Sequence, residues 1–93
     1  MDNLELIKEA RIWIRKGSEI FDDEIKQTMD AGILDLKNAG VKKIDIEDPL
    51  IKQALKLYLK SHFGYEKESE KFENSYTHLK ISLSLSGDYN GGE

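Results

Sequence analysis

The sequence contains no cysteine, which excludes disulfide bonds and thiolate metal sites. It also lacks any apolar run near the roughly 20 residues that a membrane-spanning helix needs. Charged residues at Glu5, Lys8, Glu9 and Arg11 interrupt the N-terminal region, which therefore does not resemble a secretory signal. We expect a protein that is made and used in the cytoplasm, unless a larger particle carries it out.

The sequence also has fewer basic than acidic side chains, 14 against 18, which gives a net charge of -4. Proteins that coat nucleic acid concentrate positive charge to neutralise phosphates, so the composition argues against that class. A chain of 93 residues provides one domain, which buries roughly two-thirds of its unfolded surface. We therefore expect marginal stability, to which the partners in an oligomer could contribute.

No set of residues suggests catalysis or metal binding. The histidines His62 and His78 lie far apart, without carboxylates at ligand spacing, so ordinary positions on a helix surface or interface explain them. The acidic clusters at residues 22–24 and 45–48 are explained by helix capping, and neither matches a calcium-binding loop. There is no glycine-rich phosphate loop. We expect a protein that is not an enzyme and that uses no cofactor and no metal.

Apolar residues recur at helical spacing in four segments, which predicts an all-α fold, a small four-helix bundle. We expect helices over residues 3–16, 23–38, 48–62 and 70–84. Residues 81–85 also alternate between serine and apolar residues, so a strand is an alternative there, although the longer helical stripe favours a helix. The loop between the second and third helices contains Val41, Ile44 and Ile46, which could pack under the bundle; a short strand is a minor alternative.

Local signals fix several helix ends. Asp48 suits the N-cap of the third helix, and Pro49 suits its first position. Asp22 is a plausible N-cap of the second helix, and Gly40 is a plausible left-handed terminator. Gly32 lies on the apolar stripe of the second helix, which suggests that another helix passes close to it; a tolerated glycine is the equally acceptable alternative.

Residues 1–85 are predicted to form the helical domain, and residues 86–93 a flexible C-terminal tail. This last segment contains three glycines and no periodic pattern, so we expect it to be flexible when the protein is alone.

A domain this small has few inner positions for the large apolar side chains that the chain carries. The third segment is apolar on most sides, which makes it the central helix, a subunit interface, or both. Self-association is the favoured interpretation, and a tight monomeric core is the alternative. The candidate residues for a subunit interface are Trp13, Leu57, Leu59, Phe63 and Tyr65.

The first segment has a small basic face made of Lys8, Arg11, Arg15 and Lys16. A second hypothesis is therefore a small helical regulator that binds nucleic acid through this face. Acidic residues flank the same face, so a solvated surface with ion pairs along the helix explains it better.

The order and the amino-acid sequences of these segments resemble those of a known family. A helix around Asp22-Asp23-Glu24-Ile25 is followed by Gly40-Val41, and a charged segment precedes a last helix around Tyr76, Leu79 and Leu83. The most specific part is Asp48-Pro49-Leu50-Ile51-Lys52-Gln53-Ala54, continued by Leu57-Tyr58-Leu59-Lys60 and Phe63-Gly64. Over residues 20–89 the chain resembles the head–tail connector, or DNA-packaging adaptor, proteins of siphophages and of prophages in Gram-positive bacteria.

This resemblance implies a structural subunit that forms a ring, usually twelve-fold, beneath the phage portal. Such a ring extends the DNA channel, through which DNA passes without specific binding, and offers a docking surface to the stopper or tail-completion protein. It implies assembly in the host cytoplasm and a final place at the head–tail interface of the virion, with no membrane involved. The C-terminal region of such proteins reaches toward the portal, which makes Gly87, Asp88 and Tyr89 the candidate portal contacts.

Overall fold

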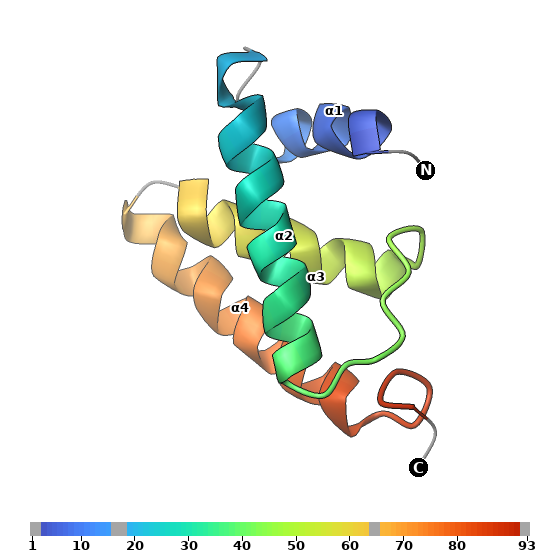
Figure 1. Cartoon of the computed structure of the whole chain (residues 1–93). Helices are drawn as coiled ribbons and strands as arrows, with labels where there is room; N and C mark the ends of the chain where they lie inside the picture. The colour runs from blue at the N-terminus through green and yellow to red at the C-terminus, as the bar shows by residue number, and fades with distance from the viewer. Residues whose placement is uncertain (1–2, 16–18, 64–65, 92–93) are drawn as a thin grey trace.

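The chain folds into four α-helices in the computed structural model, which describes residues 3–15, 19–63 and 66–91 (Figure 1). No strand occurs within these ranges, so the all-α prediction is confirmed, and residues 81–85 are helical. A short 3-10 helix, η1, precedes the second α-helix. The elements are α1 (Asn3–Ile14), η1 (Glu19–Phe21), α2 (Asp22–Asn38), α3 (Pro49–Phe63) and α4 (Glu66–Leu85).

Helix α3 is the centre of the bundle, as its apolar sides predicted. It packs against α1, α2 and α4. Helices α3 and α4 form an antiparallel hairpin, and α2 crosses in front of α3 at a steep angle in Figure 1. The bundle measures 42 × 31 × 19 Å along its principal axes. A molecule that is thin in one direction has few deeply enclosed positions, which limits how much apolar surface it can bury.

The core is formed by one cluster of buried residues from all four α-helices and the loop between α2 and α3. In that loop Val41 is fully buried, and Ile44 and Ile46 are partly buried against the cluster, so their predicted packing is confirmed. The buried members are Leu6, Ala10, Ile25, Met29, Leu36, Val41, Ile51, Ala54, Leu55, Leu59, Tyr76 and Leu83.

Helix α2 ends as its sequence predicted. Gly40 has a φ of 102°, which is the left-handed conformation that glycine adopts without a steric penalty. The Gly40 N–H donates to the Lys37 carbonyl at 3.0 Å, and the Val41 N–H donates to the Leu36 carbonyl at 3.0 Å. These two hydrogen bonds close the helix in a Schellman motif, and Leu36 and Val41 are both fully buried in the core cluster.

The N-termini of α2 and α3 differ from each other. Asp48 caps α3 as predicted, because its Oδ1 accepts a hydrogen bond from the Leu50 N–H at 2.8 Å and Pro49 is the first helical residue. The prediction for Asp22 was wrong: Phe21 occupies the N-cap position of α2 without a side-chain cap, and Asp22 is already helical. The Asp22 carboxylate binds a side chain of α1 instead.

Two helix boundaries were also predicted wrongly. Helix α1 ends at Ile14 and not at residue 16, because Arg15 turns to a left-handed φ of 57°. Helix α4 begins at Glu66, so residues 66–69 are helical where a solvated linker was expected. The side chains of the early α4 residues are mostly charged and show no apolar stripe, but Glu and Lys favour the helical backbone.

Gly32 lies where another helix comes close, which confirms the first of its two interpretations. A Cβ atom built on Gly32 would lie 3.0 Å from a ring carbon of Tyr58 and 3.3 Å from a methyl carbon of Leu55. Both neighbours belong to α3. The absence of a side chain at Gly32 therefore allows α2 to cross α3 closely.

Candidate assembly surfaces

Large apolar side chains remain exposed on several elements. Leu85 is 77% exposed and Ile81 is 50% exposed, and they lie one turn apart on the same face of α4. The C-terminal end of α4 lies at the opposite end of the molecule from η1 (Figure 1). The exposed apolar residues on the other elements are Ile12 of α1, Ile20 of η1, Leu34 of α2 and Leu50 of α3.

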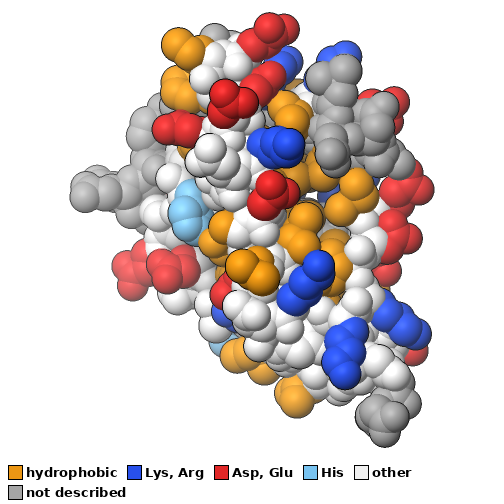
Figure 2. All heavy atoms as spheres, in the orientation of Figure 1, with side chains coloured by type: hydrophobic (Ala, Val, Ile, Leu, Met, Phe, Trp, Pro, Cys, Tyr) orange, Lys and Arg blue, Asp and Glu red, His pale blue; other side chains and the backbone are white. Residues whose placement is uncertain are grey.

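An apolar groove opens between α1, α2 and the loop that follows α2. Leu6 and Met29 at its base are buried, and Ile7, Ile33 and Ile46 are partly buried around them. Lys26 and Asp30 of α2 lie at its edge, one turn apart, and both are exposed. Figure 2 shows hydrophobic side chains at the surface beside α2, with charged side chains around them. We call this feature the α1–α2 groove.

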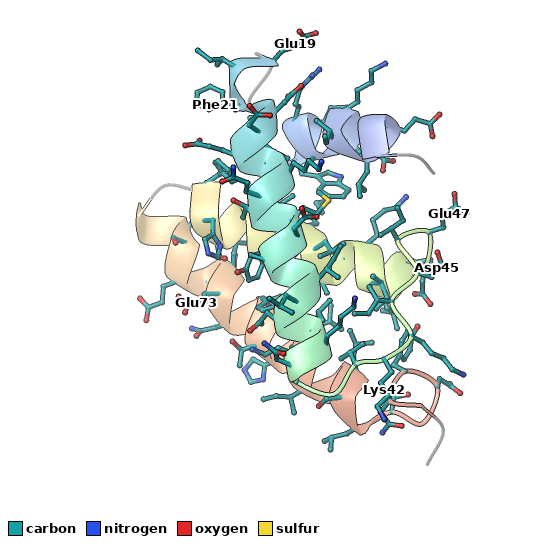
Figure 3. The ribbon with its side chains drawn as sticks, viewed as in Figure 1. Glu19, Phe21, Lys42, Asp45, Glu47 and Glu73 are labelled. Carbon is teal, nitrogen blue, oxygen red and sulfur yellow. The ribbon has the colours of Figure 1, made fainter. Side chains whose placement is uncertain are left out.

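The corner between α1 and α2 is held by a charged pair. The Arg11 guanidinium donates to both carboxylate oxygens of Asp22, through Nε at 2.7 Å and through Nη2. The hydrogen bonds from Arg11 hold the pKa of Asp22 below its ordinary value, although partial desolvation opposes the effect. This contact joins α1 to the first residue of α2, directly after η1. Figure 3 shows Glu19 and Phe21 at this end of α2.

The same pair changes the predicted basic face of the first helix. Arg11 is engaged with Asp22, whereas Lys8 and Arg15 are exposed and the side chain of Lys16 lies outside the described residues. A guanidinium that already holds a bidentate carboxylate is not available for a phosphate. The structure therefore leaves two described cations on this face for any nucleic-acid contact.

The described part of the tail, residues 86–91, folds back on the loop between α2 and α3. The Tyr89 carbonyl accepts hydrogen bonds from the Lys42 N–H at 2.7 Å and the Lys43 N–H at 3.0 Å. The Tyr89 hydroxyl donates to the Asp48 carboxylate, 2.9 Å from its Oδ2. Figure 3 shows Lys42 beside this tail, whereas Asp45 and Glu47 extend away from the bundle.

These contacts bear on the three candidate portal residues. Gly87 and Asp88 are exposed, whereas Tyr89 is partly buried and packs against the core. The sequence predicted a flexible tail, whereas in the structure Tyr89 makes defined hydrogen bonds to the loop between α2 and α3 and to Asp48. Flexibility of the tail in solution, the boundary at residue 85 and the contact with a portal stay predictions.

Hydrogen-bonded polar side chains join α2 to α4. The Tyr76 hydroxyl donates to Asp35 Oδ2 at 2.6 Å, and the Lys80 ammonium donates to the same oxygen at 3.0 Å. Partial burial alone would raise the pKa of Asp35, but the hydrogen bonds from Tyr76 and Lys80 outweigh it and lower that pKa. Burial, and then the bond to Asp35, raise the pKa of Tyr76. The two hydrogen bonds to Asp35 thus join α2 to α4.

The predicted subunit-interface residues lie in different surroundings. Trp13, Leu57 and Phe63 are partly buried and pack against the core, so part of each remains accessible. Leu59 is completely buried within the chain, which leaves no exposed part of it for a neighbour. Tyr65 lies outside the described residues. The contact of the first three residues with another subunit stays a prediction.

The predicted interface residues do not include the most exposed apolar residues, because the prediction concentrated on large side chains beside the apolar stripes of the helices. Leu34 and Leu85 lie off the buried stripes of their helices, and this is the signal that could have found them. Ile20 could not be placed in this way, because a three-residue helix has no stripe.

Within residues 3–15, 19–63 and 66–91, no group of three His, Asp or Glu residues comes together in a way that could hold a metal ion. No helix there is both long enough and apolar enough to cross a membrane.

Comparison with known protein families gives one match. The family model described as "Phage connector protein" matches residues 4–90, which is almost the whole chain. The chain belongs to the phage connector protein family. Its predicted resemblance is therefore confirmed, and as a connector it associates with other phage head or tail proteins at the head–tail interface of the virion. No curated protein and no solved structure gives a significant match.

Proposed function

We propose that this connector works as a head-completion adaptor, which assembles as a ring beneath the phage portal and extends the DNA channel. The observation that carries the proposal is the distribution of exposed apolar side chains over different elements and opposite ends of the bundle. A subunit of a closed ring needs two different lateral surfaces, because each copy presents one to the neighbour before it and the other to the neighbour after it. It also needs an upper and a lower surface for the portal and for the stopper or tail-completion protein.

The arrangement of charge supports the same role. The net charge is -4, and among the described side chains the basic face of α1 has one of its cations engaged by Asp22. A channel wall that attracts DNA phosphates strongly would hinder the passage of DNA. A weakly acidic ring would leave the DNA mobile in the channel. Assembly through complementary surfaces requires no catalytic group.

Electron microscopy tests this function directly. Purified connector is incubated with isolated portal complexes of the same phage over a range of concentrations, and the particles are imaged and classified. We expect an additional ring on one face of the portal, with the same rotational order in most particles. Portal complexes that stay bare at every concentration, while the connector remains folded by circular dichroism, would contradict the proposal.

A further inference from the structure

A hollow on α1 is lined by cations. It has a volume of about 460 Å³, and its lining consists of Lys8, Arg11, Ile12 and Arg15. Ile12 is 75% exposed, and none of the described lining side chains is acidic. The charge and the size of this hollow, which we call the basic hollow, therefore suit an acidic segment that also carries an apolar side chain.

The segment formed by η1 and the start of α2 has the opposite character. Glu19, Asp23 and Glu24 are exposed, and Ile20 among them is 79% exposed. Residues 19–25 contain no lysine and no arginine. Figure 2 shows acidic and hydrophobic side chains together at the end of the molecule where η1 lies in Figure 1. Residues 19–24, which we call the acidic segment, thus match the basic hollow in charge and in their exposed isoleucine.

The charges of these two surfaces are partly balanced within one chain. The hydrogen bonds to Asp22, and to a smaller extent the charge of Glu19, raise the pKa of Arg11. These three side chains therefore neutralise one another where α1 meets the start of α2. The two other cations of the basic hollow, Lys8 and Arg15, are exposed, and so are the two other acidic residues of the segment.

We propose that the basic hollow of one copy receives the acidic segment of the next copy, an inference that rests on the proposed ring. In this contact Ile20 packs against Ile12, and the carboxylates of Asp23 and Glu24 face the exposed cations of the hollow. The contact joins two different surfaces, so it is heterologous and repeats from copy to copy until the ring closes.

A protein surface suits the basic hollow better than nucleic acid does. Phosphates are bound by cations and by polar donors, and the exposed side chain of Ile12 is neither. Arg11 is already held by Asp22, so two exposed cations remain for a phosphate backbone. The acidic segment supplies both the carboxylates and the apolar side chain that the hollow suits.

Residues 45–50 are the other segment that combines exposed acidic residues with an exposed apolar residue. Its apolar residue, Leu50, is 46% exposed, and lysines at positions 43 and 52 flank it on both sides. The acidic segment has no such cations within it and exposes its isoleucine more fully, so it is the better match.

Reversal of the charges tests the contact, because the proposal predicts both a loss and a rescue. The first variant carries Lys8→Glu with Arg15→Glu, and the second carries Asp23→Lys with Glu24→Lys. Each variant alone places like charges opposite each other, so the concentration needed for rings on portal complexes should rise about tenfold or more. The chain with all four substitutions restores opposite charges and should form rings close to the original concentration.

The matched control changes the net charge as the first variant does, at positions outside both surfaces. It carries Lys37→Glu with Lys71→Glu, and both lysines are exposed. This control should assemble nearly as the unchanged protein does. All variants should keep the helical circular dichroism spectrum.

Cysteine cross-linking provides a second measurement, and the natural absence of cysteine makes it specific. One preparation carries Ile12→Cys and the other Ile20→Cys; the two are mixed, assembled on portal complexes and oxidised. We expect a covalent dimer that contains one chain of each kind. Leu50→Cys in place of Ile20→Cys should give no dimer above background.

The outcomes separate this inference from the proposed function. Rings that lack the Ile12–Ile20 cross-link, or folded chains with all four substitutions that form no rings, would overturn the inference and leave the adaptor function standing. A cross-link from Ile12→Cys to Leu50→Cys would overturn it as well, because residues 45–50 would then occupy the hollow. The same holds if the first variant forms rings normally but loses binding to DNA in a gel-shift assay. If the unchanged protein forms no ring at all, both proposals fail.

Discussion

Tyr76 connects α4 to α2 at the level of a single side chain. It is 4% exposed, and its hydroxyl lies 2.6 Å from the Asp35 carboxylate, which also receives Lys80. Its ring meets the ring of Tyr58 edge to face, with centroids 5.0 Å apart. One residue thus combines an apolar contact to α3 with a charge-assisted hydrogen bond to α2.

Replacing Tyr76 by phenylalanine should keep the ring and remove the hydrogen bond. Because Asp35 would lose its shortest donor, we expect Tyr76→Phe to lower the free energy of unfolding by about 1–2 kcal/mol. Urea unfolding followed by circular dichroism measures the change. Lys80→Met, which removes the more exposed donor, should cost less. A Tyr76→Phe protein as stable as the unchanged one would contradict this role.

Gly32 provides a second prediction at this scale. An alanine in a helix is favoured over glycine by about 1 kcal/mol, but overpacking of a close contact costs about 1–3 kcal/mol. The Tyr58 ring cannot move away freely, because it also contacts His62 and Tyr76. We therefore expect Gly32→Ala to destabilise the protein by about 1 kcal/mol in thermal or urea unfolding.

A control on the same helix isolates the crossing. Ala31 is exposed, so Ala31→Gly measures the propensity of α2 alone and should cost about 1 kcal/mol. If Gly32→Ala instead stabilises the protein, the close approach of α2 and α3 at this position is not limiting.

Among the elements, the tail and the loop between α2 and α3 depend on one carboxylate. Asp48 caps α3 and accepts the Tyr89 hydroxyl. The hydrogen bond from the Leu50 N–H, aided by that from Tyr89, lowers the pKa of Asp48 despite some desolvation. A carboxylate whose pKa is lower in the folded state stabilises that state above its ordinary pKa, and this stabilisation is lost as the pH falls through the lowered value.

Acid should therefore loosen the tail before the bundle unfolds. As the pH falls below about 4, we expect the backbone amide resonances of Lys42 and Lys43 to shift together with those of Tyr89. NMR titration follows these shifts. Tyr89→Phe removes the hydroxyl donor and should weaken tail docking already at neutral pH. Resonances that stay constant until global unfolding would show that Asp48 does not control the tail.

The sequence could predict elements whose causes are local. Gly40 and the pair Asp48-Pro49 fixed helix ends correctly, because their conformational preferences act within a few residues. Asp22 was misassigned because its partner, Arg11, belongs to another helix. The docking of Tyr89 on Asp48 was missed for the same reason, since the two residues are 41 apart in the sequence. The early residues of α4 were missed because charge without periodicity does not distinguish a linker from an exposed helix.

At the scale of the whole molecule, large apolar side chains do remain exposed, but they are partly different residues from the predicted ones. Leu59 is enclosed, because α3 is covered on three sides by other helices. Leu85, Ile20 and Ile12 are exposed instead, at 75–79%. Which apolar residues stay outside depends on the crossing of the helices, and periodicity within one segment does not contain that information.

The central claim is that this connector is a component of the particle between head and tail. A cryo-electron microscopy reconstruction of the neck of virions from the phage or prophage that encodes it tests this claim most directly. We expect a ring of density beneath the portal into which copies of the four-helix bundle fit, with the chain detected in the same virions by mass spectrometry. A neck complete without such a bundle, in virions that contain none of this chain, would contradict the account.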